Sequence, residues 1–214
     1  MQSRVIRTPA RLILWLMVVS LVFVTCSDDS ECPTCPTCPT LTQWVYYDNF
    51  DNNTLNSDLW STTIHYGGQV LETAGQLQVW GHTDYWTGAG IVIAIQPKLA
   101  WRFDLVDTYF EEGAGCQGWH IAVRDSAGTT GVEVLNRATA GCTNPPDMGD
   151  ATGRYEIRHE GDSLAVYGDD SLLRRVHDHG ISSFVIRFES NNVWGDGAHC
   201  RVFIDNVWGL ELAP

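Results

Sequence analysis

The stretch "RYEIRHEGDSLAVYGDDSLLRRV", residues 154–176, shows the pattern that decides the fold of this chain. Residues 155–159 alternate between apolar and polar side chains, and residues 163–167 form a second such run after the turn "EGDS". A period of two residues is typical of β-strands, because successive side chains point to opposite faces. Glycine and aspartate between the runs are turn residues. The stretch therefore predicts a strand, a tight turn and a second strand.

Runs of the same kind, punctuated by Gly, Asp and Asn, fill the chain from residue 44 onward. No stretch of ten residues holds a convincing helical period of 3.6. Many short strands at regular spacing predict an all-β sandwich or barrel. Further strands are expected at residues 76–80, 101–105, 119–123, 184–188 and 200–204.

Four segments, in this order and spacing, resemble concanavalin A-like lectin and glucanase domains. The opening segments "DNFDNNTLNSDLW" (48–60) and "GGQVLETAGQLQVWG" (67–81) are similar to their first strands. Residues 154–176 resemble a laminin-G-type hairpin, and "RVFIDNVWGLEL" (201–212) resembles the closing strand. The resemblance implies an antiparallel jelly-roll β-sandwich over residues 44–214, with the first and last strands side by side.

The N-terminus carries the features of an export signal. Three arginines precede an apolar run over residues 12–24, and no acidic residue occurs before Asp28. Such a run is shorter than the roughly 20 residues that span a bilayer, and it predicts a signal peptide over residues 1–25. A short uncleaved anchor is the alternative. The end of the run resembles a bacterial lipoprotein signal, which implies a lipidated Cys26 and a protein anchored at the cell surface, on the outer membrane or the periplasmic side.

Residues 26–43 are predicted to be an extended tether. The repeated Cys-Pro-Thr triplet favours polyproline II, in which Cys32, Cys35 and Cys38 fall along one edge. Neighbouring sulfurs then stand on backbone positions about 9 Å apart, beyond the roughly 7 Å limit for a disulfide. Oxidation would therefore join these cysteines to another chain or to the domain, which predicts self-association through the tether.

The remaining cysteines lie in the domain. Cys116 and Cys142 bracket a predicted hairpin, and a disulfide between them would contribute roughly 3 kcal/mol. Cys200, on a predicted strand, is expected to be a buried small hydrophobic residue.

The charge balance excludes a nucleic-acid partner. The formal net charge is −13, and it becomes −16 once the three arginines of the signal are removed. A nucleic-acid-binding domain carries a basic patch instead. The acidic surface suits divalent cations or simple solubility.

Aromatic residues outside the core register indicate a carbohydrate site. Trp60, Trp101, Trp119 and Trp208 are in core register and are expected to pack inside. Other rings lie on the opposite register or in loops, where they could cover the flat face of a sugar while polar neighbours bind its hydroxyls. Rings that merely cover a sheet edge are the alternative. The predicted carbohydrate-binding residues are Trp80, His82, Asp84, Tyr85, Trp86, Asn192, Trp194 and Asp196.

The enzymatic alternative rests on one strand. Laminarinase-like relatives carry their acids in the pattern Glu-x-Asp-x-x-Glu, and the approximation here is Glu156 and Glu160 with Arg158 between them. An arginine at that place would pair with both acids and hold their pKa values down, which does not suit a general acid. The strand is therefore interpreted as a solvated charge ladder, and the domain is expected not to be an enzyme.

The resemblance also implies a structural calcium ion that joins the first and last strands. By matching motif, its ligands would be Asp48 or Asp51 and Asp205, since calcium prefers carboxylate and carbonyl oxygens. Ordinary surface acids are the alternative.

The sequence thus predicts a non-catalytic cell-surface lipoprotein whose β-sandwich binds a glycan, for adhesion or glycan capture. One alternative is a structural or protein-interaction module cross-linked through its tether cysteines. The other alternative is a divergent glycoside hydrolase.

Overall fold

The computed structural model describes residues 41–82, 88–110, 117–125, 127, 131–138, 152–177, 180–192 and 199–213. Within these residues the chain forms thirteen β-strands in two antiparallel sheets. The predicted signal peptide and tether, residues 1–40, lie outside them. None of the described segments is a helix long and apolar enough to cross a membrane.

The larger sheet holds eight strands. Its order is β11-β10-β9-β6-β13-β4-β3, and β1 pairs with β13 beside that path. In chain order the strands are β1 (Thr42–Asp48), β3 (Gln69–Thr73), β4 (Gln76–His82), β6 (Ala100–Phe110), β9 (Gly153–Glu160), β10 (Ser163–Gly168), β11 (Ser171–His177) and β13 (His199–Leu212).

The smaller sheet holds five strands in the order β2-β5-β12-β7-β8. The strands are β2 (Trp60–His65), β5 (Gly88–Ala94), β7 (Gln117–Asp125), β8 (Gly131–Ala138) and β12 (Phe184–Asn192). All-β architecture and the two-layer sandwich expected from the alternating pattern are therefore confirmed.

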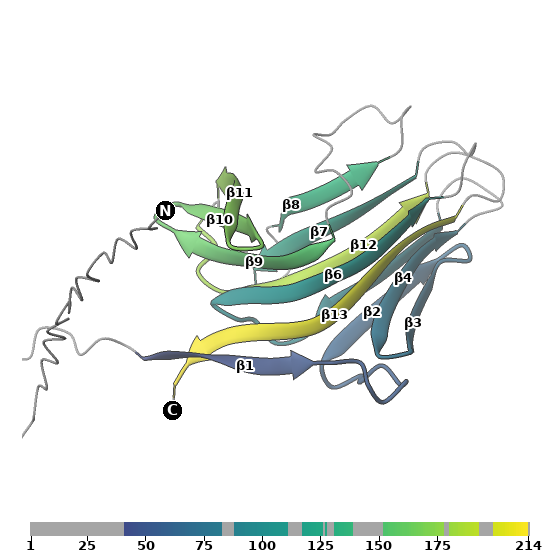
Figure 1. Cartoon of the computed structure of the whole chain (residues 1–214), viewed down its shortest axis with the longest axis horizontal. Coiled ribbons are helices and arrows are strands. Elements are labelled where there is room, and N and C mark those ends of the chain that lie inside the picture. Colours follow the sequence, from purple (N-terminus) through teal and green to yellow (C-terminus); the bar gives the residue numbers. More distant parts are fainter. Residues whose placement is uncertain are drawn as a thin grey trace, which may run out of the picture. The chain divides into compact units, whose positions relative to one another are not determined.

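The first and last strands of the domain lie side by side, as predicted. Thr42 of β1 pairs with Leu212 of β13, and Asp48 pairs with Val207 (Figure 1). The long β13 pairs with β4 through its first half and with β1 through its second half. The first and last strands of the domain are thus neighbours within the larger sheet.

Aromatic side chains from both sheets fill the space between them. Trp60, Trp101 and Trp119 are buried, as predicted, and the Trp101 indole Nε1 donates to the carbonyl of Phe184 in the other sheet at 2.7 Å. Trp208 differs from its prediction, because it is only partly buried and packs edge-on against Tyr46, which is itself exposed. The physical reason is an irregular register between Asp205 and Trp208, which places Val207 inside and turns Trp208 outward.

Candidate functional site

A hollow of about 450 Å³ lies on the outer face of the five-stranded sheet. Strands β7, β8 and β12 form its floor, and residues of these strands line it, most of them with outward side chains. The lining residues are His120, Ala122, Arg124, Gly131, Val132, Glu133, Arg187 and Glu189. This combination of acids, arginines and an imidazole suits binding or acid–base chemistry on a polar ligand.

Strand pairing brings an imidazole between two carboxylates in this hollow. Glu189 of β12 pairs with His120 of β7, and Glu133 of β8 pairs with Ala122, two residues further along β7. Paired residues of antiparallel strands project from the same face. The carboxylate Oε2 of Glu133 lies 3.5 Å from His120 Nδ1. Glu133 and Glu189 thus approach His120 from strands on opposite sides of it.

A bulge in β8 decides which of its residues face the hollow. The register shifts between Ile121 and Ala122 of β7, so that Val134 of β8 is an extra, buried residue. Glu133 and Asn136 consequently share the outer face although they are three positions apart. Gly131, Glu133 and Asn136 have the same spacing as the three acids of the Glu-x-Asp-x-x-Glu pattern. Glu133 takes the place of the aspartate and is the only acid of the three, since Gly131 and Asn136 take the places of the two glutamates.

Several polar atoms around the hollow lack hydrogen-bond partners among the described residues. They are Nδ1 of His120, Oδ1 of the buried Asn136 and Nε of Arg187. The 3.5 Å contact of His120 with Glu133 is too long to be a good hydrogen bond. Buried polar atoms are nearly always satisfied, so a group of unsatisfied ones indicates a place where a polar ligand or water supplies the bonds.

Glu189 is held in place by its own strand. Its carboxylate forms an ion pair with the guanidinium of Arg187, and both side chains are only 16% exposed. Glu133 is freer, with 44% of its side chain exposed. The hollow therefore pairs one oriented carboxylate with one accessible carboxylate.

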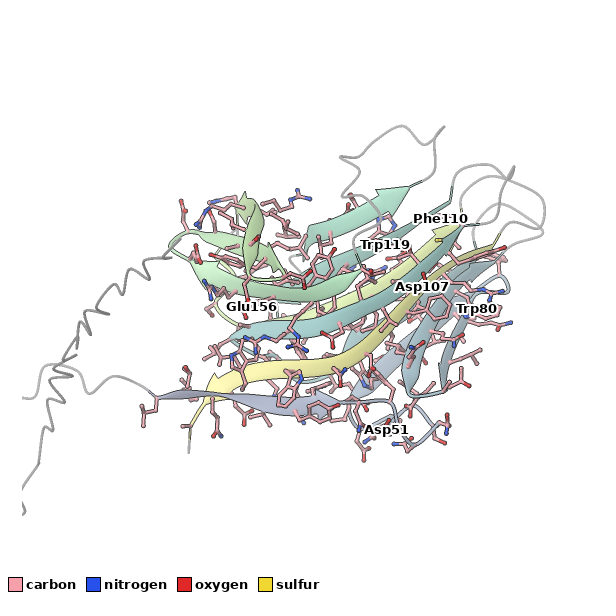
Figure 2. All side chains as sticks on the ribbon, viewed as in Figure 1. Asp51, Trp80, Asp107, Phe110, Trp119 and Glu156 are labelled. Carbon is pink, nitrogen blue, oxygen red and sulfur yellow. The ribbon has the colours of Figure 1, made fainter. Side chains whose placement is uncertain are left out.

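Glu156 and Glu160, the pair of the enzymatic alternative, lie on β9 of the other sheet (Figure 2 labels Glu156). Arg158 bonds both acids at 3.0 Å, and Arg102 and Arg175 each add an ion pair at 2.6 Å. The Tyr167 hydroxyl and Arg158 donate hydrogen bonds that lower the pKa of the Glu160 carboxyl to about 2. A carboxyl with such a pKa cannot serve as a general acid near neutral pH.

The predicted carbohydrate-binding residues are divided between the two sheets. Trp80 lies on β4 and is partly buried, while Asn192 ends β12 in the smaller sheet. His82 ends β4 opposite His199, where β13 begins. The other predicted positions lie outside the described residues, and they are Asp84, Tyr85, Trp86, Trp194 and Asp196.

The predicted calcium ligands lie at an acidic junction near the β1–β13 pair. Both oxygens of Asp48 already accept hydrogen bonds, from the Phe50 backbone N–H at 3.0 Å and from Trp60 Nε1 at 2.7 Å. Burial raises the pKa of Asp205, and the nearby carboxylates of Asp104 and Asp51 raise it further.

No group of three acidic, histidine or cysteine side chains placed to hold a metal occurs among the described residues. Because Asp48 is committed to protein donors, Asp51 and Asp205 remain as the predicted carboxylate ligands. The calcium ion stays a prediction.

Of the cysteines, the structure describes Cys200, which is fully buried on β13. The predicted disulfide cysteines Cys116 and Cys142 lie outside the described residues. So do Cys26 and the tether cysteines Cys32, Cys35 and Cys38.

The domain has the concanavalin A-like jelly-roll β-sandwich fold, as comparison with solved structures shows. The catalytic domain of an endo-1,3-β-glucanase (laminarinase) from Thermotoga petrophila is similar with a TM-score of 0.55 and 11% identity, over 82% of this chain and 100% of that chain. The laminarinase catalytic domain from Thermotoga maritima is similar with a TM-score of 0.56 and 10% identity, over 81% of this chain and 99% of that chain.

A β-1,3-glucanase from Mycobacterium marinum is also similar, with a TM-score of 0.51 and 11% identity, over 79% of this chain and 99% of that chain. No protein-family model matches the sequence, and no curated protein matches it either.

These comparisons correct the expectation of a non-catalytic domain. The solved structures that share the fold over nearly their whole length include catalytic domains of glucanases, which supports the glycosidase alternative instead. The sequence analysis considered only the acids of one strand, Glu156 and Glu160. Glu133 and Glu189 are 56 residues apart in the chain, and strand pairing alone brings them to one face.

Proposed function

We propose that the domain is a glycoside hydrolase that acts on a polysaccharide in the hollow over β7, β8 and β12. The observation that carries the proposal is the pair Glu133 and Glu189 on either side of His120. The jelly-roll fold shared with glucanase catalytic domains supports the same activity. The unsatisfied polar atoms of His120 and Arg187 would bond the hydroxyls of the sugar.

The two carboxyl groups would share the work of hydrolysis. Glu133, the accessible carboxyl, would donate a proton to the glycosidic oxygen, and Glu189, whose negative charge is stabilised by Arg187, would accept a proton from the water that attacks the anomeric carbon. The reaction adds one water across the bond and releases two sugar ends. His120, in contact with Glu133, is placed to orient that carboxyl.

The spacing of the strands favours inversion of the anomeric centre. Glu133 and Glu189 stand on strands separated by β7 and are offset by two residues along it, so their backbones are about 12 Å apart, from two strand spacings of about 4.8 Å and two residues of about 3.3 Å. Retaining enzymes hold their carboxyls about 5 to 5.5 Å apart, whereas inverting enzymes leave about 6.5 to 9.5 Å for a water. The wider spacing suits a water between the carboxyls better than direct attack by one of them.

Release of reducing sugar from laminarin and other neutral glucans tests the activity. Glu133→Gln and Glu189→Gln are each expected to lower the rate at least about 100-fold, since acid–base groups contribute on that scale. Glu156→Gln is the matched control, because this carboxylate lies on the other sheet and is engaged by two arginines. A wild type that releases no sugar from any glucan would overturn the proposal. So would a control variant that loses as much activity as the other two.

The predicted signal peptide, lipidated cysteine and tether would place the protein at the bacterial cell surface. A lipid on Cys26 would hold the protein on a bacterial membrane, and the Cys-Pro-Thr segment would keep the hydrolase away from the bilayer, where polysaccharide is accessible. Labelling of expressing cells with a fatty-acid analogue tests this, since Cys26→Ser should remove the label and release the protein from the membrane. Persistence of the label in that variant would contradict the proposal.

A further inference from the structure

A row of outward side chains crosses four strands of the eight-stranded sheet. It lies on the outer face of that sheet, whereas the hollow lies on the outer face of the five-stranded sheet. Arg201 of β13 pairs with Trp80 of β4 on one side and with Tyr109 of β6 on the other. Gln69 of β3 pairs with Trp80 and extends the row. Three strand spacings make the row about 14 Å long. Figure 2 shows Trp80 on this part of the sheet.

The rings and the guanidinium in this row are held against one another. The Arg201 guanidinium carbon lies 3.4 Å from the centre of the Trp80 ring and 5.3 Å from that of Tyr109. The Trp80 Nε1 donates to Gln78 Oε1 at 3.3 Å. Fixing the ring before a ligand arrives reduces the entropy lost on binding.

The row is also accessible. Tyr109 is 44% exposed, and Trp80 and Arg201 are partly exposed. An aromatic ring can cover the C–H face of a sugar while neighbouring amides and cations bind its hydroxyls. The row presents both kinds of group together.

A second, parallel row widens this surface. Phe203 of β13 pairs with Gln78 of β4 and Asp107 of β6, and Gln78 pairs with Leu71 of β3. Leu71 is 41% exposed. The other end of the same sheet differs, because ion pairs of Glu156 and Glu160 with arginines cover it. Apolar and amide side chains are thus concentrated at the Trp80 end.

We infer that the surface formed by Gln69, Gln78, Trp80, Tyr109 and Arg201 binds a neutral polysaccharide chain, as a second site separate from the hollow. The aromatic and amide groups match the faces and hydroxyls of sugar rings. A polyanion is disfavoured because the chain carries a formal charge of −13. The site lies on the other sheet from Glu133 and Glu189, so it would keep the protein on its polymer without taking part in hydrolysis.

Affinity electrophoresis of the full chain in gels that contain laminarin measures this binding. The Glu133→Gln background prevents hydrolysis of the matrix, and all variants are compared within it. Trp80→Ala is expected to raise the dissociation constant for laminarin at least about tenfold. Arg201→Gln should also raise the dissociation constant. Trp80→Phe, which keeps a ring, should lose less affinity than Trp80→Ala.

Trp44→Ala is the matched control. Trp44 is also a partly buried tryptophan on this sheet with an arginine over its ring, Arg102 at 4.2 Å, but it lies on β1, away from the row. This variant should keep the parent's affinity. Thermal unfolding of each variant identifies any that fails to fold, and Arg201→Gln then decides in place of Trp80→Ala.

The inference is overturned if folded Trp80→Ala and Arg201→Gln variants bind like the parent. Equal loss in Trp44→Ala, or a parent that binds an anionic polysaccharide and not laminarin, would overturn it as well. The hydrolase proposal is tested by a different assay, the release of reducing sugar, so the two proposals can fail independently. Gel retention that depends on Trp80 would stand even if no glucan were cleaved.

Discussion

Asp48 is expected to contribute a large share of the stability of the domain. It is 8% exposed, and its two carboxylate oxygens accept from the Phe50 backbone N–H and from Trp60 Nε1. Asp48→Ala would leave both donors buried without an acceptor. Each unsatisfied donor costs about 1 to 3 kcal/mol, so the free energy of unfolding should fall by about 2 to 6 kcal/mol. Domains of this kind have about 5 to 15 kcal/mol in all.

Asp48→Asn separates the hydrogen bonds from the shape of the side chain. The amide keeps one acceptor oxygen, so one of the two donors remains satisfied and the loss should be about 1 to 3 kcal/mol. Asp58→Ala is the control for the change of charge, because Asp58 is exposed and its substitution should change stability by less than about 0.5 kcal/mol.

Denaturant unfolding followed by tryptophan fluorescence measures these differences through the midpoint and the slope. The expected ranking of stability is wild type, then Asp48→Asn, then Asp48→Ala. If Asp48→Ala unfolds within about 0.5 kcal/mol of the wild type, the two hydrogen bonds do not stabilise the fold as argued.

Three further outcomes are expected. The pKa of Glu160 lies below its ordinary value of 4.5, at about 2, so its contribution to stability is complete above pH 4.5 and is lost as the pH falls toward 2. Tyr167→Phe removes the strongest donor, and acid titration of unfolding should then show a smaller loss over that window. Gly90→Ala should destabilise the domain by about 1 to 3 kcal/mol in thermal unfolding, because the added Cβ would lie 2.3 Å from the carbonyl oxygen of Gln69 and 2.7 Å from that of Trp80. Proton NMR during hydrolysis of a glucan should show a first-formed product of inverted anomeric configuration, and a retained product would contradict the assignment of Glu133 and Glu189.

Local periodicity was sufficient to predict seven of the thirteen strands by their residue ranges. The alternation in residues 155–159 and 163–167 reappears as β9 and β10, because the pleat of a strand sends neighbouring side chains to opposite faces. The same argument placed Trp60, Trp101 and Trp119 inside. It was wrong for Trp208, since a bulge shifts the alternation and no local pattern marked it.

The candidate active site depended on the tertiary structure. His120 and Glu133 belong to the consecutive strands β7 and β8, whereas Glu189 belongs to β12, which is distant from them in the chain. Each of the three alone resembles an ordinary polar residue on a sheet surface. Pairing and register between strands decide which side chains meet, and a one-residue bulge at Val134 decides which face they take. The sequence by itself therefore determined the all-β class and the position of those strands, because the alternation of side chains along a strand is a local property. The two surfaces proposed to bind sugar depend on pairing with strands distant in the chain, β12 for one and β13 for the other, which only the folded sheet defines.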